Sequence, residues 1–278
     1  MKEYLTTTSA ARMAGVGVSS IKRWADEGRL RTVRTPGGHR RLIRADFVAF
    51  LTNPESRNPE GKATISPRDS VHPLDVVGSE WADAILNSEF HALQAKLLEA
   101  RGRNGSWLTT MDELSSGVRE MGIRWSKDLI TIAEEHVASD RLSRVLSSIY
   151  EAMPVAPNAP RCLLSSVEGD MHTLGLAMLQ VALREMGWRC LWLGSLTPMN
   201  EVSNLVENRN VDMVALSASR ASNDHASLAS QLNEVVPLCK KTNTKLILGG
   251  RGAWPEPLSY GTRFQDFSSL THLITPVR

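Results

Sequence analysis

The second half of the sequence alternates short apolar runs with longer stretches of helical spacing. The apolar runs lie at 161–167, 189–193, 211–217, 245–249 and 270–274, and the helical stretches lie at 172–186, 198–208, 225–241 and about 255–261. Apolar runs of this length are typical of strands that are buried on both faces, and the intervening helices must cover those faces. The pattern therefore predicts a Rossmann-like α/β domain, a doubly wound parallel sheet.

Two proline-rich segments divide the rest of the chain. Residues 52–78 contain four prolines and no sustained periodicity, which is typical of an exposed linker. Residues 153–160, MPVAPNAP, contain three prolines and cannot continue a helix. Between these segments apolar residues recur at helical spacing, with breaks near Gly102–Gly105 and Gly122, which predicts a bundle of about four helices. We therefore expect a linker at 52–78 and domains at 1–51, 79–153 and 154–278.

The composition is that of a soluble protein. Of the 278 residues 42% are hydrophobic, yet no apolar segment approaches the roughly 20 residues that a membrane span needs. The N-terminus lacks the apolar core of a secretory signal. The cysteines Cys162, Cys190 and Cys239 are embedded in apolar runs, which favours reduced thiols over disulfides or a zinc cluster. We expect a cytoplasmic protein with no membrane partner.

The first 51 residues form a basic segment with the pattern of a DNA-binding domain. They carry ten Lys/Arg and four Asp/Glu, a net charge of +6, whereas the remaining residues carry a net charge of −4. Two short helical stretches flank a turn at Gly15–Gly17, and two short β runs flank the Gly37-Gly38 dipeptide. A helical pair followed by a hairpin predicts a winged helix-turn-helix, whose basic side chains neutralise DNA phosphates.

Residues 34–42, RTPGGHRRL, match the wing signature of MerR-type and excisionase-type regulators almost letter for letter. The N-terminal segment therefore resembles the winged helix-turn-helix domains of those families. This resemblance implies double-stranded DNA as a partner, and we expect Trp24 to lie in the core rather than on the DNA. The implied base or phosphate contacts are Ser19, Ser20, Lys22 and Arg23 on the second helix, and Arg34, His39, Arg40 and Arg41 on the wing.

Three short motifs follow strands of the predicted parallel sheet. The segment DMHTLG, residues 170–175, follows the first apolar run, Ser217-Ala218-Ser219 ends the third, and Gly249-Gly250 ends the fourth. Carboxyl ends of parallel strands meet at one edge, where such sheets bind ligands. His172 can offer a ring nitrogen to a metal while Asp170, two residues earlier, holds its other N–H. Alone the motif also suits a capping histidine, but the three motifs together predict a ligand site in which Gly175 leaves room for a bulky group.

The order DxHxxG, SxL, GG resembles the cobalamin-binding domain of methionine synthase-like and related corrinoid proteins. The resemblance implies that His172 is the lower axial ligand of cobalt and that Asp170 holds its other nitrogen. It also implies that Ser217 meets the displaced dimethylbenzimidazole of cobalamin, and that Gly249 and Gly250 line the groove for its nucleotide tail. This chain departs from the pattern at Ser219, where the family usually has leucine.

Residues 125–136 carry a tryptophan, a glutamate and a histidine at a distinctive spacing. Trp125 and His136 are eleven residues apart, three helical turns, so we expect both on one helix face, and Trp125, Glu135 and His136 can all border the same pocket. Periodicity alone would also suit a core tryptophan and a solvated Glu–His pair. The spacing resembles the cap of the CarH/LitR photoreceptor repressors, in which these residues surround the 5′-deoxyadenosyl upper ligand of cobalamin.

One position departs from that cap. Members with a documented second histidine ligand carry it directly after the tryptophan, and here that position is Ser126. The light-state ligand is therefore open between His136, water and another group, and His91 is a further candidate for the pocket. We expect His225 and His272 to be ordinary surface or strand-end residues.

With this cap, the resemblance to the CarH/LitR family covers nearly the whole chain, in the order winged helix-turn-helix, helical bundle, cobalamin domain. It implies a light-responsive, cobalamin-binding transcriptional repressor that catalyses no reaction. Adenosylcobalamin would hold a homo-oligomer, dimer or tetramer, on DNA in the dark, and light would separate it by breaking the cobalt–carbon bond. The alternatives are a corrinoid carrier of a methyl-transfer system and a cobalamin photoreceptor with an additional linear tetrapyrrole. A Rossmann-like sensor of another small molecule is disfavoured, because no GxGxxG follows the first apolar run.

Overall fold

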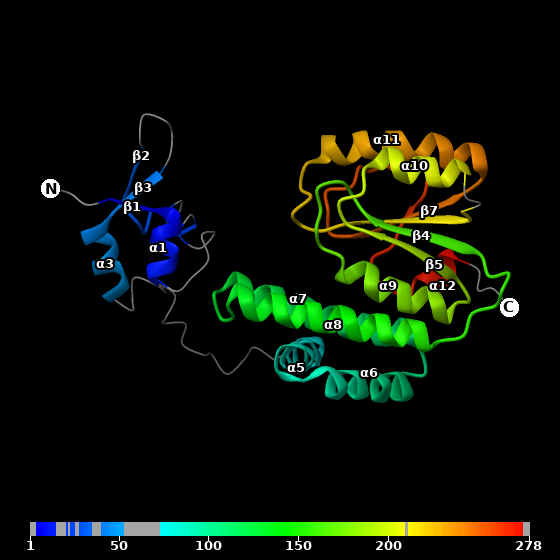
Figure 1. Ribbon diagram of the computed structural model, residues 1–278, viewed down its shortest axis with the longest axis horizontal. Helices are drawn as coiled ribbons and strands as arrows, with labels where there is room; N and C mark the ends of the chain where they lie inside the picture. Colours follow the sequence, from blue (N-terminus) through cyan, green and yellow to red (C-terminus); the bar gives the residue numbers. More distant parts are fainter. Residues whose placement is uncertain are drawn as a thin grey trace. The chain divides into compact units, whose positions relative to one another are not determined.

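The computed structural model describes residues 4–14, 21, 23–25, 28–34, 40–52, 73–208 and 211–274 (Figure 1). Backbone contacts divide the chain into two compact units, one of residues 1–73 with 121–136 and the other of residues 74–120 with 137–278. Within the described residues, no helix combines the length and the apolar character needed to cross a membrane.

The N-terminal part contains a small antiparallel sheet and helices packed on it. In the residues described there, the strands lie in the order β1-β3-β2. Trp24 is 5% exposed and its ring centroid lies 5.2 Å from that of Phe50, so the expectation of a core tryptophan is confirmed. The elements are β1 (Tyr4–Thr6), α1 (Thr7–Ala14), β2 (Thr32–Arg34), β3 (Arg40–Ile43) and α3 (Arg44–Thr52).

Residues 73–152, all of which the structure describes, form four helices. Helix α5 begins at Pro73, where proline is favoured because the first helical N–H has no partner to lose, so the last residues of the expected linker are helical. Gly122 does not break a helix as expected, since one internal glycine costs only about 1 kcal/mol. The helices are α5 (Pro73–Asn87), α6 (Phe90–Asn104), α7 (Trp107–Ser126) and α8 (Ile132–Ala152).

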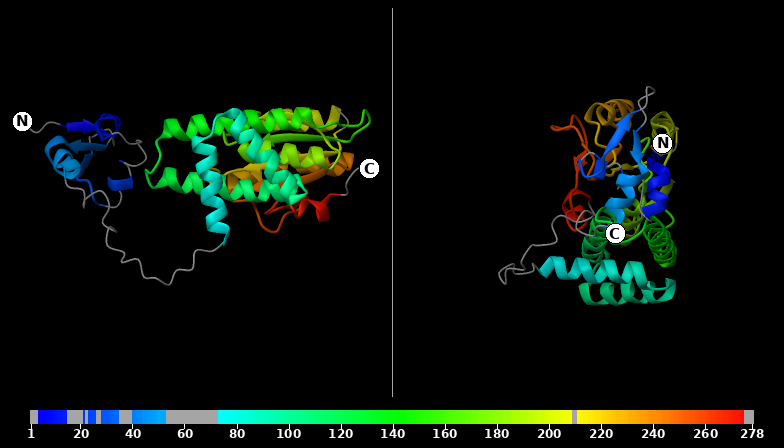
Figure 2. Two further views of the ribbon diagram at one scale, coloured as in Figure 1. Left: turned by 90° about the horizontal axis from the view of Figure 1, so that it is seen from below. Right: turned by 90° about the vertical axis from the view of Figure 1, so that its left-hand side faces the viewer.

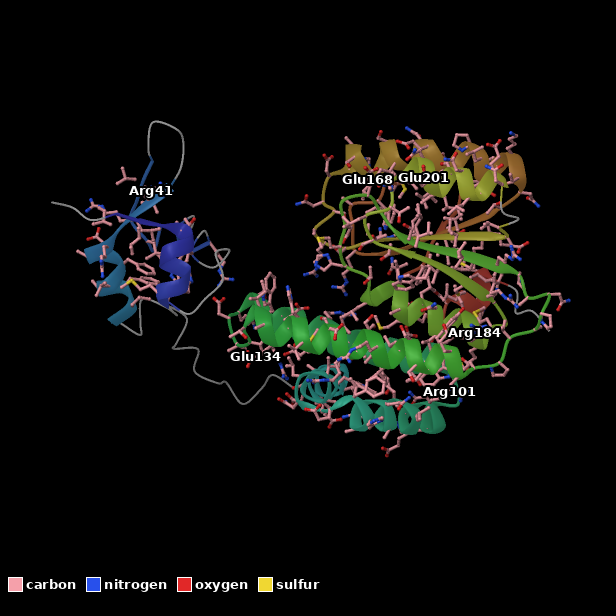
Figure 3. All side chains as sticks on the ribbon, viewed as in Figure 1. Arg41, Arg101, Glu134, Glu168, Arg184 and Glu201 are labelled. Carbon is pink, nitrogen blue, oxygen red and sulfur yellow. The ribbon has the colours of Figure 1, made fainter. Side chains whose placement is uncertain are left out.

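The break between α7 and α8 falls inside the segment that was expected to be one helix. Thr131 and Glu134 form a capping box, in which the Glu134 carboxylate accepts from the Thr131 amide at 2.6 Å and the Thr131 hydroxyl accepts from the Glu134 amide at 3.2 Å. Glu134 accordingly lies where α8 begins (Figure 3). Trp125 is therefore in the last turn of α7 and His136 is the fifth residue of α8, so the expectation of a single helix face is wrong.

Helix α5 lies across α7 and α8 rather than along them (Figures 1 and 2). The crossing is close at Gly117, where an added Cβ would stand 2.3 Å from the Cβ of Trp81. Gly78 of α5 faces α7 in the same way, because a Cβ added to it would stand 3.3 Å from the Ser116 carbonyl oxygen. Small residues on both helices therefore allow their backbones to approach.

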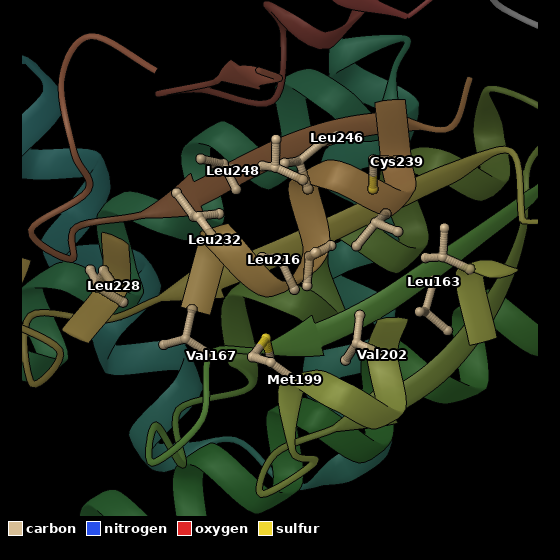
Figure 4. Close-up of a cluster of buried hydrophobic side chains, with 14 of the residues drawn as sticks. Leu163, Val167, Met199, Val202, Leu216, Leu228, Leu232, Cys239, Leu246 and Leu248 are labelled. Carbon is tan, nitrogen blue, oxygen red and sulfur yellow. The ribbon is translucent and has the colours of Figure 1, made fainter. Parts of the chain in front are cut away.

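The C-terminal part is a parallel sheet with helices on both faces. In the described residues its five strands lie in the order β5-β4-β6-β7-β8 and all pair in parallel. Helices α10 and α11 cover one face and α9 the other (Figure 1). The elements are β4 (Arg161–Ser166), α9 (Leu174–Glu185), β5 (Arg189–Gly194), α10 (Met199–Asn208), β6 (Met213–Ala218), α11 (His225–Thr242), β7 (Lys245–Gly250) and β8 (Thr262–Arg263). The predicted doubly wound fold is confirmed, and Figure 4 shows the apolar core beneath α10 and α11.

Two expected elements at the C-terminal end are wrong. No helix forms at 255–261, because Pro255 and Pro257 remove backbone donors and clash with a helical turn. Residues 270–273 form the short helix α12 rather than a strand, and the fifth strand is β8. Leu270 and Ile274 are both fully buried, and their spacing of four places both on one side of a helical turn.

Side chains of the helical region and the C-terminal part bind to one another. The Glu185 carboxylate of α9 accepts from the Trp107 amide at 2.7 Å and the Ser106 hydroxyl at 2.9 Å, and it forms an ion pair with Arg101 at 2.7 Å. A carboxylate at this place satisfies free amides and complements the helix dipole at the start of α7. Helix α7 is thus capped by a residue from another part of the chain.

We expect Gly117→Ala to destabilise the protein by about 1–3 kcal/mol, because the new methyl group overpacks the α5–α7 crossing. The matched control is Gly122→Ala in the same helix, where an added Cβ meets no atom within 4 Å. That change should stabilise by up to about 1 kcal/mol through helix propensity. Chemical denaturation measures both, and equal effects of the two substitutions would contradict the close crossing.

Candidate functional site: a histidine on the rim of the parallel sheet

The predicted motifs meet at the point where the chain changes direction across the sheet. From β4 the chain goes to β5 on one side, and then returns to β6 on the other side of β4. The loops after β4 and β6 therefore diverge at this point, which is where doubly wound sheets bind ligands. Ser217 pairs in register with Ser166 of β4 and with Gly249 of β7, so the motifs lie on one edge as expected.

The Asp170 carboxylate is buried, 1% exposed, and joins the two loops. One oxygen accepts from the His172 amide at 3.0 Å and faces the ring Nδ1 at 2.9 Å. The other accepts from the Ser219 amide at 2.6 Å and the Ser222 hydroxyl at 2.7 Å. Burial raises the pKa of Asp170, but the hydrogen bonds from His172, Ser219 and Ser222 outweigh it and lower the pKa from 3.8 to about 2. Asp170 is thus a carboxylate at neutral pH.

His172 is held by one ring nitrogen and exposes the rest of its side chain, which is 69% accessible. Because the Asp170 carboxylate can only accept, Nδ1 must carry the proton, and in the neutral ring Nε2 keeps its lone pair. Metal-ligating histidines usually have this arrangement. The hydrogen bond from the second ring nitrogen fixes the ring orientation and makes the first nitrogen a better ligand.

Ser219, the departure from the SxL pattern, belongs to the same network. Its hydroxyl lies 3.1 Å from Nδ1 of His172 and accepts from the Ala221 amide at 3.1 Å. Ser222, which also binds Asp170, was missed by the sequence analysis, because a single serine three residues after a motif has no distinguishing pattern. The loop after β6 therefore contributes two serines to the histidine site.

The three glycines of the motifs have different surroundings. A Cβ on Gly175 would make ordinary contact with the Ser217 hydroxyl, at 3.7 Å, so protein packing does not require glycine there. A Cβ on Gly249 would meet the Phe264 ring at 2.8 Å. Gly250 has φ +81° and an added Cβ would meet the Ala218 carbonyl at 2.2 Å. The Gly-Gly pair is required by packing, whereas a Cβ on Gly175 would be tolerated next to Ser217.

The turn between α7 and α8 gathers exposed apolar side chains. Trp125 is 40% exposed, Leu129 69% and Ile132 53%. The Ser126 hydroxyl donates to the Ile123 carbonyl at 2.7 Å, within its own helix. Large apolar side chains exposed together usually mark a binding surface.

The histidines His91, His136, His225 and His272 are all exposed. His136 Nδ1 lies 2.7 Å from the Glu135 carboxylate, and its side chain is 71% exposed. His91, at the start of α6, makes an edge contact with Phe90, with ring centroids 5.2 Å apart. His225 and His272 are exposed, at the start of α11 and in α12.

The expected DNA contacts are described in part. Arg34 and Arg40 pair in register across β2 and β3, next to the hairpin connection. Arg41 follows on β3, half-buried (Figure 3), and Arg23 is half-buried in the helical stretch 23–25. The remaining calls, Ser19, Ser20, Lys22 and His39, lie outside the described residues.

Within the part of the chain that the structure describes, no three His, Cys, Asp or Glu side chains gather in a way that could hold a metal ion.

Comparison with known proteins agrees with this reading of the two ends of the chain. Residues 160–260 match the B12 binding domain family, and residues 4–54 match the helix-turn-helix domain family. The HTH-type transcriptional repressor CarA of Myxococcus xanthus is 35% identical over 136 residues, which cover 49% of this chain and 44% of CarA. The repressor CarH of the same organism is 27% identical over 253 residues, which cover 82% of this chain and 84% of CarH.

The monomethylamine corrinoid protein of Methanosarcina barkeri has a similar structure. The TM-score is 0.54 at 17% identity, and the match covers 71% of this chain and 96% of that protein. This likeness concerns the fold, a helical region followed by the parallel sheet domain. The chain is homologous to the CarA and CarH repressors and carries a helix-turn-helix domain followed by a B12 binding domain, although it spans less than half of CarA.

We expect acid to remove the stabilisation that Asp170 provides. Its pKa is lower in the folded protein than in the unfolded chain, so the stabilisation is complete above pH 4 and is lost as the pH falls towards about 2. The lowering corresponds to about 2 kcal/mol. Denaturant unfolding of wild type and Asp170→Asn should converge over this range, and a constant difference between them would contradict the lowered pKa.

Proposed function

We propose that this homologue of CarA and CarH is a cobalamin-binding, light-responsive transcriptional repressor rather than an enzyme. The observation that carries the proposal is the Asp170–His172 pair at the switch point of the sheet, in a chain that also has a helix-turn-helix domain. A repressor bound to its operator would act in the cytoplasm.

The residues on the rim would suit a histidine that holds cobalt. Asp170 holds the proton on Nδ1 of His172, so Nε2 is available to the metal without a change of tautomer. Gly175 leaves the neighbouring space open, and Ser217 lies at its edge. Ser217, Ser219, Gly249 and Gly250 would then bound the space for the dimethylbenzimidazole and the nucleotide tail.

The exposed apolar side chains of the α7–α8 turn would suit contact with the adenosyl group of the cofactor. We propose that Trp125 packs against a 5′-deoxyadenosyl group, with Glu135 and His136 beside it. When bound, adenosylcobalamin supplies a cobalt–carbon bond that light breaks. The Ser126 hydroxyl is engaged with Ile123, which makes it a poor replacement for a second histidine ligand and leaves His136 as the nearest imidazole in the sequence.

The DNA output would follow from oligomerisation. One winged domain makes few phosphate contacts, whereas linked domains raise the effective concentration of each other on the operator. We propose that the dark, cobalamin-bound chain forms a dimer or tetramer on DNA, and that loss of the upper ligand uncovers the α7–α8 turn and separates the assembly.

The main alternative is a corrinoid carrier in methyl transfer, which the fold of the monomethylamine corrinoid protein would suit. The helix-turn-helix domain at residues 4–54 favours the repressor, because a carrier has no use for a DNA-binding wing. An additional linear tetrapyrrole beside cobalamin is a second alternative, which the absorption spectrum of the loaded protein would reveal.

The proposed function is tested by adding adenosylcobalamin to the full chain in the dark. We expect retention of the cofactor, a larger assembly by size exclusion, and a change of both spectrum and size after illumination. His172→Ala should lose the cofactor or alter its spectrum, because the lower axial nitrogen is removed. A chain that retains no cobalamin would overturn the proposal.

The matched control is His225→Ala, which removes an exposed histidine of the same domain. It should leave uptake, spectrum and light response unchanged. Retention of cobalamin without any light response would favour the carrier instead.

We expect Arg40→Ala to weaken DNA binding several-fold and to reduce the salt dependence of the affinity by about one phosphate contact, while cobalamin uptake stays intact. Fluorescence anisotropy with operator DNA at several salt concentrations measures both. The control is Arg144→Ala, an exposed arginine of α8 paired with Asp140. Equal affinities of Arg40→Ala and wild type would remove the role assigned to the wing.

A further inference from the structure

Two arginines lie on the same edge of the sheet as His172, and a third, from α7, lies near them. Arg220 lies two residues after β6 and Arg251 directly after β7. Ala218 and Gly250 pair in register, so the two chain segments leave the sheet side by side. The Gly252 amide donates to the Ala218 carbonyl at 2.8 Å and ties the two loops together.

The third arginine, Arg119, comes from α7. It lies seven residues after Asp112, two helical turns, and therefore on the same face of the helix. The Asp112 carboxylate accepts from the backbone amides of Phe267 at 2.6 Å and Ser268 at 3.0 Å. This face of α7 thus lies against the C-terminal part, and Arg119 is close enough to Arg251 for the two charges to interact.

The charges of the three arginines are not neutralised by the protein. Within the described residues, no carboxylate forms an ion pair with Arg119, Arg220 or Arg251. Partial burial lowers the pKa of Arg251, and the nearby Arg119 and Arg220 charges lower it further. Three like charges held together disfavour one another, and a bound anion would relieve the repulsion.

We propose that Arg119, Arg220 and Arg251 bind a phosphodiester, namely the phosphodiester in the nucleotide tail of cobalamin. Guanidinium groups suit this ligand, because their donors match the geometry of phosphate oxygens and their charge survives at any working pH. The tail is the source because Arg220 and Arg251 share the edge that carries His172, and the side chains of the corrin ring are neutral amides. This inference rests on the proposed function, and it gives the site a preference for complete cobalamin over a corrinoid without the tail.

The test compares two corrinoids in the dark, adenosylcobalamin and adenosylcobinamide, which lacks the phosphodiester and its base. We expect the double variant Arg220→Gln/Arg251→Gln to bind adenosylcobalamin at least about tenfold more weakly than wild type, because charge-assisted hydrogen bonds are lost. Its affinity for adenosylcobinamide should stay within about twofold, since that ligand has no group for these arginines. Spectral titration measures all four affinities, and the ratio of the two changes isolates the phosphodiester.

Two further variants serve as controls for the loss of charge and of the guanidinium group. Arg144→Gln removes an exposed arginine of α8 and should bind both corrinoids as wild type does. Arg251→Lys keeps the charge but loses the forked donors, and should bind adenosylcobalamin with an affinity between those of wild type and the double variant. Thermal unfolding should show the double variant to be at least as stable as wild type, because like charges are removed.

Three results would overturn the inference. Equal losses of affinity for both corrinoids would mean that the arginines support the corrin ring or the fold. Unchanged cobalamin affinity with weakened DNA binding would identify DNA phosphates as the partner. The double variant could also keep its cobalamin affinity while His172→Ala still alters the spectrum of the loaded protein. That result would overturn this inference alone and leave the proposed function intact.

Discussion

The buried carboxylate of Asp170 joins the two loops that diverge at the switch point of the sheet. It accepts from the amides of His172 and Ser219 and from the Ser222 hydroxyl, and it fixes the ring of His172. A buried charge without such donors would cost several kcal/mol, so the loops and the carboxylate stabilise one another. The orientation of the exposed histidine is thus a property of the folded rim rather than of a flexible loop.

Much of the fold could be predicted, because the chain marks its strands and helices by periodicity. The strands β4, β5, β6 and β7 and their parallel pairing were predicted from apolar runs separated by amphipathic stretches, whereas their order across the sheet is not marked by periodicity. The fifth strand, Thr262–Arg263, has two residues and no periodicity to detect. The prediction of a helix at 255–261 did not take account of Pro255 and Pro257. The apolar run at 270–274 suits one buried helical turn as well as a strand.

The site was predictable where a motif carried it, and not elsewhere. Asp170 and His172 follow from a short motif after a strand, whereas Ser222 reaches the carboxylate through a loop conformation that no spacing encodes. The spacing of Trp125 and His136 suggested one helix, although Thr131 and Glu134 already had the signature of a new helix start. A local capping signal outweighed the periodicity on which the prediction depended.

Because Glu185 caps α7, helix α9 connects the histidine site directly to the start of α7. The helix begins at Leu174, two residues after His172, and ends at the residue whose carboxylate holds the first amides of α7. Helix α9 therefore spans about 18 Å between the histidine site and the first turn of α7. A displacement of the imidazole along the axis of α9 would therefore act on the hydrogen bonds between Glu185 and the start of α7, without any change in the sheet.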